Sequence, residues 1–104
     1  MKKSLEDTLN KTFEKYVVNI KNCVQSDLQR EIKNRFVSIV VGGTNKVDGV
    51  NMKMYLLVVY DDRTKYVASC NIYLDKKGVI VKPYSSSNSD VGLAQYVTDC
   101  VERV

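Results

Sequence analysis

Residues 66–82 read YVASCNIYLDKKGVIVK and combine a strand-like alternation with a tight-turn signal. Apolar side chains occupy every second position from Tyr66 to Leu74, which is the period of a strand with one buried face. The next four residues, Asp-Lys-Lys-Gly at 75–78, are typical of a hairpin turn whose glycine adopts a positive φ. The stretch therefore predicts two antiparallel strands, over residues 66–74 and 79–82.

Two further strands are expected upstream of this hairpin. Residues 36–41 form a β-branched run, and residues 52–60 form a longer apolar run after a polar loop that reaches Asn51. Residues 61–64, Asp-Asp-Arg-Thr, are typical of a turn. Because short connections make neighbouring strands antiparallel, the four strands are expected to form a meander sheet.

Helical periodicity marks both ends of the chain. From Ser4, a suitable N-cap, to Ile32 apolar residues recur every three or four positions. A second capping signal at Ser26 leaves open whether this helix bends or divides near Gln25. Another amphipathic helix is expected after residues 88–90. The predicted fold is α+β, a four-stranded antiparallel meander sheet with a long N-terminal helix and a C-terminal helix (α-β-β-β-β-α), in one domain over residues 1–104.

Composition fits one domain and excludes much of enzyme chemistry. The chain has 104 residues, 44% of them hydrophobic, and it contains no histidine. The usual general base and the commonest ligand of catalytic zinc are therefore missing. Cys23, Cys70 and Cys100 form no Cys-x-x-Cys pair and lie on apolar faces, so buried reduced thiols are expected. We expect no cofactor, no metal and no enzymatic activity.

Location and charge narrow the class of partner. No apolar run approaches the roughly 18 residues of a membrane span, and Met1 is not followed by an apolar signal segment. With reduced cysteines, this predicts a cytoplasmic protein that does not enter a membrane. The net charge of +4 is a mild bias that speeds association with nucleic acid or with an acidic protein and identifies neither.

The strand over residues 52–60 is apolar on both faces, which a sheet with one buried face does not require. The helices could cover opposite faces, the long helix could wrap an edge of the sheet, or a protein partner or a second copy could cover one face. If both helices pack on the side of Ala68 and Cys70, the other face would carry a contiguous patch that binds a protein partner or forms a homodimer. The residues expected in that patch are Tyr55, Leu57, Val59, Val67 and Tyr73.

An alternative use of this face is nucleic-acid binding, in which lysines surround rings that stack on bases. The residues expected for it are Lys53, Tyr55, Lys65, Tyr73 and Lys82.

A second candidate feature is a glycine-led segment after the first strand. Its residues, Gly42, Gly43, Thr44, Asn45 and Lys46, would expose backbone amides beside a lysine. Phosphate-loop spacing is incomplete, and a strand rather than a helix is expected to follow. The segment is therefore interpreted as a flexible connection, or else as a loop that binds protein or nucleic acid.

Elimination leaves surface recognition as the predicted function. We expect a small protein-binding module, an inhibitor or adaptor of the kind that phages and other mobile genetic elements encode. Small size and a surplus of lysine and asparagine favour that origin.

Overall fold

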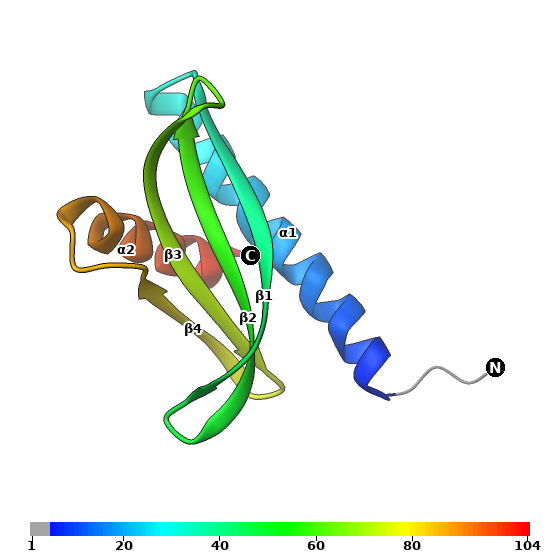
Figure 1. Ribbon diagram of the computed structural model, residues 1–104. Coiled ribbons are helices and arrows are strands. Elements are labelled where there is room, and N and C mark those ends of the chain that lie inside the picture. Colours follow the sequence, from blue (N-terminus) through cyan, green and yellow to red (C-terminus); the bar gives the residue numbers. More distant parts are fainter. Residues whose placement is uncertain (1–4) are drawn as a thin grey trace.

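The computed structural model describes the backbone of residues 5–104 and the side chains of residues 12–104, so the predicted cap Ser4 lies outside the described residues. Six elements follow one another: α1 (Leu5–Glu31), β1 (Arg35–Val47), β2 (Val50–Asp61), β3 (Lys65–Asp75), β4 (Gly78–Pro83) and α2 (Asn88–Arg103). The strands pair antiparallel in the order β1-β2-β3-β4. The predicted α-β-β-β-β-α meander is confirmed (Figure 1).

Both helices pack on the same side of the sheet, which gives a two-layer molecule (Figure 1). One hydrophobic core lies between the layers, and α1 and α2 also contact each other there. The helices contribute Val17, Ile20, Val24, Leu28, Leu93, Ala94, Val97 and Cys100 to this core. The opposite side of the sheet carries neither of the two helices.

Helix α1 runs through Gln25 without a break. The side-chain oxygen of Gln25 accepts a hydrogen bond from the backbone N–H of Val37 at 3.1 Å. One turn later, the side-chain amide of Gln29 donates to the carbonyl oxygen of Arg35 at 2.9 Å. These glutamines satisfy backbone groups at the outer edge of β1, which has no neighbouring strand there, and so tie the helix to the sheet.

Strand β1 is longer than predicted. The prediction that the glycine-led segment is a loop is therefore wrong. Gly42 lies at a β-bulge, and the strand then continues to Val47. The chain reverses instead at Asp48 and Gly49, both with positive φ (51° and 81°), as a two-residue hairpin turn requires. The polar segment of β1 therefore pairs with β2 and is not a loop: Gly43, Thr44, Asn45 and Lys46 lie opposite Met54, Lys53, Met52 and Asn51.

The hairpin between β3 and β4 forms where it was predicted, but by another mechanism. Gly78 does not adopt a positive φ. Instead, the carboxylate of Asp75 accepts hydrogen bonds from the backbone N–H groups of Lys77 (2.8 Å) and Gly78 (2.9 Å). The aspartate side chain thus holds the turn, and glycine is not needed for its backbone freedom.

Neither described helix is apolar enough over a sufficient length to cross a membrane.

Candidate functional site

The strand register decides which side chains of β2 face the helices. Directly opposite residues share a face of the sheet. Tyr55 pairs with Ile72, Leu57 pairs with Cys70, and Val59 pairs with Ala68, which places all six on the helix side. Tyr55, Leu57 and Val59 are at most 1% exposed and belong to the core. The prediction that these three residues lie on the uncovered face is therefore wrong.

Val67 also departs from its predicted face. It has no partner in the ladder, because Val59 pairs with Ala68 and Tyr60 pairs with Tyr66. This bulge adds one residue to β3, and Val67 packs against the core. Of the five residues predicted for a protein-binding patch, Tyr73 alone lies on the uncovered side, opposite Met54 and Ile80.

The uncovered side of the sheet is itself apolar, and we name it the open face. Its middle is formed by the residues of β2 that alternate with the core residues of that strand. These residues are hydrophobic too, and their cross-strand partners complete the face. The open face comprises Phe36, Ser38, Val40, Met54, Leu56, Val58, Tyr60, Tyr66, Ser69, Asn71, Tyr73, Ile80 and Lys82.

The side chains of the open face form a packed layer with exposed members at its margins. Val58, in the middle, is only 6% exposed, whereas Val40 on the edge strand β1 is 52% exposed. At one end, the guanidinium of Arg63 lies 4.5 Å from the centroid of the Phe36 ring, a cation–π contact. Side chains of the open face are thus partly buried by their neighbours on the same face.

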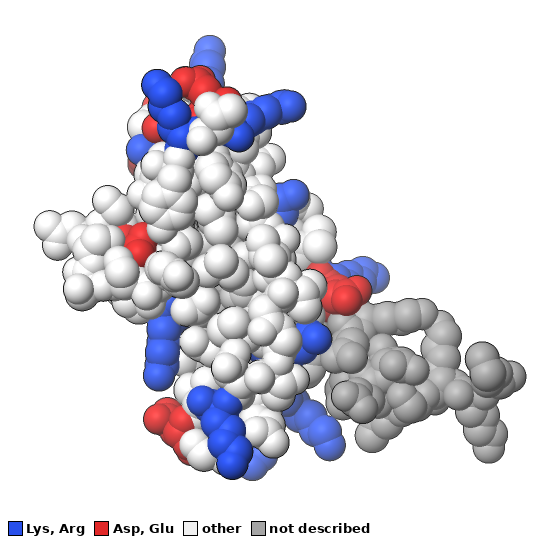
Figure 2. Space-filling view, viewed as in Figure 1, with Lys and Arg blue, Asp and Glu red and all other residues white. Residues whose placement is uncertain are grey.

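Charge is confined to the boundary of this surface. Figure 2, which views the molecule from the open face, shows a middle without lysine, arginine, aspartate or glutamate. Basic and acidic side chains gather at both ends of the sheet, and further side chains of both signs lie along its flanks. The residues of the open face run from Met54 to Tyr60 on β2 and from Tyr66 to Tyr73 on β3, so seven steps of about 3.3 Å and strands about 4.8 Å apart give a face of roughly 23 Å by 15–20 Å. This planar area of roughly 350–450 Å², to which side-chain relief adds, is about half of the about 800 Å² that each partner contributes to a standard interface.

Asp90 connects the margin of the open face to α2. It is 3% exposed, and its carboxylate accepts hydrogen bonds from the backbone N–H of Ser69 (2.9 Å) and from the N–H (3.0 Å) and hydroxyl (2.7 Å) of Ser85. The hydroxyl of Tyr66 lies 3.5 Å from the same carboxylate and 2.7 Å from the hydroxyl of Ser69. Burial alone would raise the pKa of Asp90, but the donors from Ser85, Ser69 and Tyr66 hold that pKa below its ordinary value of 3.8. Asp90 is therefore a charged structural anchor.

The five residues predicted for nucleic-acid binding do not share one surface. Tyr55 is buried, so its ring cannot stack on a base. Lys53 pairs with Leu74, on the helix side of the sheet, and Lys65 begins β3 at the far end. Tyr73 and Lys82 lie on the open face.

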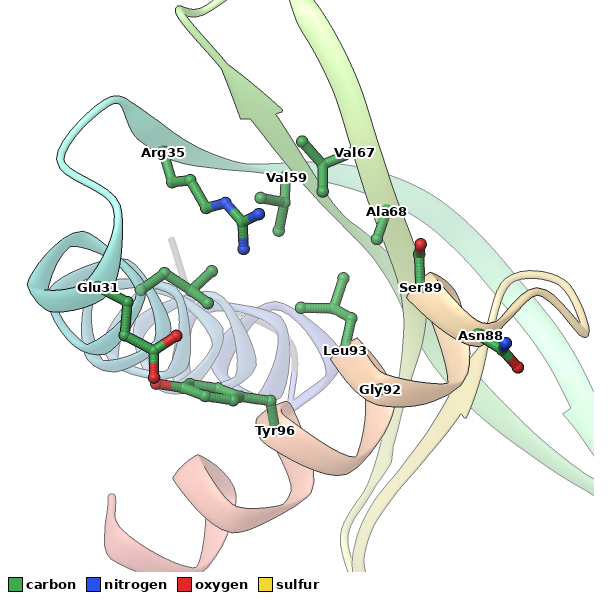
Figure 3. A pocket seen from close by; sticks show the side chains of 11 residues that line it. Glu31, Arg35, Val59, Val67, Ala68, Asn88, Ser89, Gly92, Leu93 and Tyr96 are labelled. Carbon is green, nitrogen blue, oxygen red and sulfur yellow. The ribbon is translucent and has the colours of Figure 1, made fainter.

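A separate cleft of about 270 Å³ opens between the C-terminal end of α1 and the N-terminal half of α2 (Figure 3). Leu93, Ala68, Val59 and Val67 form an apolar floor, with Arg35 and Glu31 on one side and Asn88 and Ser89 on the other. The Nε of Arg35 is already paired with Asp61 at 3.3 Å. The lining offers no nucleophile with an adjacent base and suits a small apolar group.

Comparisons with protein-family models, with curated proteins and with solved structures find no match to this chain.

Proposed function

We propose that this chain is a non-enzymatic protein-binding module, and that its open face docks on the open face of a second copy. One observation carries the proposal: an apolar sheet face, uncharged in its middle, lies opposite the side on which both helices pack. Apolar surface of this extent is favourable to bury, and contiguous patches on soluble domains mark sites of association.

The shape and charge of the open face favour a second copy. Two sheets pack face to face about 10 Å apart when each presents an apolar inner face, with strand directions about 30° apart. The middle is uncharged, so two copies bring no like charges together there. Each end carries both signs, which allows acids of one copy to lie near bases of the other. An inhibitor or adaptor role, and an origin in a phage or mobile element, stay predictions from composition.

Light scattering on matched variants tests this function. The wild-type chain is expected to be a dimer, and Val40→Lys a monomer with unchanged circular dichroism, because the added lysine is solvated in the monomer and unpaired in the dimer. Val18 is the control, since it is 48% exposed on α1, and Val18→Lys should remain a dimer. A monomeric wild type at all concentrations, or a dimeric Val40→Lys, would overturn the proposal.

A further variant, Tyr73→Ala, distinguishes nucleic-acid binding at the open face from docking of a second copy. If the wild-type chain bound single- or double-stranded oligonucleotides with submicromolar affinity at physiological salt, and Tyr73→Ala abolished that binding, the open face would be a stacking surface instead. We expect weak and sequence-independent retention at most.

A further inference from the structure

Helix packing brings together three metal-binding groups that are distant in the sequence. Cys23 and Asp27 lie one turn apart on α1, and Cys100 lies on α2. The two sulfurs and a carboxylate oxygen all lie within 4.8 Å of one another. The Sγ of Cys100 is 3.8 Å from Oδ2 of Asp27. This cluster is on the helix side of the molecule and is separate from the open face.

Two cationic side chains already lie beside the cluster. The Nη1 of Arg30 is 3.6 Å from Oδ1 of Asp27. The guanidinium of Arg103 forms a salt bridge with Asp27, and its Nη2 lies 3.2 Å from the Sγ of Cys100. A cavity of about 390 Å³, lined by Asp27, Tyr96, Asp99 and Arg103, opens beside them. Cys100 is fully buried, Cys23 is half-buried, and the Asp27 side chain is 12% exposed. The site is thus sheltered by packing and accessible from one side.

We propose that Cys23, Asp27 and Cys100 bind a zinc ion that joins α1 to α2. Two thiolates and one carboxylate form a donor set that suits zinc better than the harder magnesium or calcium ions, which prefer oxygen ligands. Zinc takes four ligands in a tetrahedron, and separations of up to 4.8 Å between donor atoms need only small side-chain movements to meet typical zinc–ligand distances of about 2.0–2.3 Å. The fourth position would be filled by water from the adjoining cavity.

Protons and charge balance in this site. Binding converts both thiols to thiolates, so two protons pass to solvent for each zinc ion bound. Two thiolates, the carboxylate and Zn²⁺ leave a net charge of −1. Arg103, in contact with both Asp27 and Cys100, offsets that charge, and Arg30, whose Nη1 lies 3.6 Å from Oδ1 of Asp27, adds a second and more exposed positive charge. Its guanidinium is 54% exposed, so it can shift while the ion enters.

Cobalt(II) is the probe for this site, because it replaces zinc and reports its ligands optically. Titration of the fully reduced chain with Co²⁺ should produce a thiolate-to-cobalt charge-transfer band and visible bands of tetrahedral cobalt. Both should saturate at one equivalent and disappear when Zn²⁺ is added. Zinc should also raise the melting temperature of the wild-type chain, whereas Mg²⁺ should not.

Variants of single cysteines locate the ion. Cys23→Ser and Cys100→Ser should each abolish the charge-transfer band and the thermal shift, and Asp27→Asn should weaken binding at least tenfold. Cys70→Ala is the matched control, since Cys70 is a buried core thiol of β3, and this variant should bind Co²⁺ as the wild type does. The absence of a band in the wild type, or a band that survives in Cys23→Ser, would overturn the zinc site.

Discussion

The carboxylate of Asp90 accepts a hydrogen bond from the backbone N–H of Ser69 and thereby joins the first turn of α2 to β3. The last pair between β3 and β4 is Cys70 with Pro83, so the pairing stops one residue short of Ser69. The Asp90 carboxylate therefore accepts the hydrogen bond of the Ser69 N–H, for which β4 offers no paired residue. The same carboxylate holds Ser85 in the segment that connects β4 to α2.

Asp90→Ala should lower the free energy of unfolding by roughly 3 kcal/mol, because it leaves the buried N–H of Ser69 and the partly buried donors of Ser85 without their acceptor. Chemical denaturation followed by circular dichroism measures this change. Asp99→Ala is the control, since Asp99 is exposed on the same helix, and it should have little effect. Equal effects of the two substitutions would contradict the structural role of Asp90.

The contribution of Asp90 should depend on pH in a defined window. Its pKa in the folded chain lies below the ordinary value of 3.8, so the unfolded chain binds its proton first as the pH falls. The stabilisation is fully present well above pH 3.8 and is lost as the pH falls through the lowered pKa. The difference in unfolding free energy between wild type and Asp90→Asn should be constant near neutrality and shrink below pH 3.8. A difference that grew on acidification would contradict this sign.

Leu57 distinguishes the two faces of β2. It is completely buried against the helices, so Leu57→Lys should destabilise the fold by roughly 3–5 kcal/mol through an unpaired buried charge. Loss of helical signal and of cooperative unfolding should accompany this change. A folded, soluble Leu57→Lys monomer would show that Leu57 belongs to an interface after all.

Tyr55 carries a buried hydroxyl that has no hydrogen-bond partner among the described residues. Burial raises the pKa of this phenol, and the charge of Glu14 adds to the shift. Tyr55→Phe removes an unsatisfied polar group and leaves the ring in place, so it should raise the free energy of unfolding by up to about 1 kcal/mol. Thermal and chemical unfolding measure the difference, and a clear loss of stability would mean that the hydroxyl has a partner.

The order of elements could be predicted because each has its own period. The alternation from Tyr66 to Leu74 and the three-to-four-residue spacing in α1 are local properties of the chain. The assignment of faces could not be predicted in the same way. Strand β2 is apolar on both sides, so the pattern alone cannot say whether Leu56 or Leu57 faces the helices, and only the pairing with Cys70 decides.

Bulges and distant contacts explain the remaining differences. The bulge in β3 moves Val67 to the core side, and the bulge at Gly42 lets β1 continue as a strand. Neither bulge changes the hydrophobic pattern enough to be recognised. Contacts between distant segments cannot be predicted from a local pattern. Cys23 and Asp27 have the i, i+4 spacing of a helix face, but Cys100 joins them only through the packing of α2 on α1.

Photo-crosslinking from Tyr73 tests the docking of the open face most directly. A benzophenone amino acid at position 73 keeps an aromatic ring on the open face, and the same replacement at Tyr84, which is 62% exposed and outside that face, serves as the control. Mixing isotopically labelled and unlabelled chains lets mass spectrometry identify links between two copies. We expect position 73 to link to open-face residues on the strands of a second copy and position 84 to give few such links. Links from position 73 to α1 or α2 of another copy, or no links between copies, would contradict the proposed function.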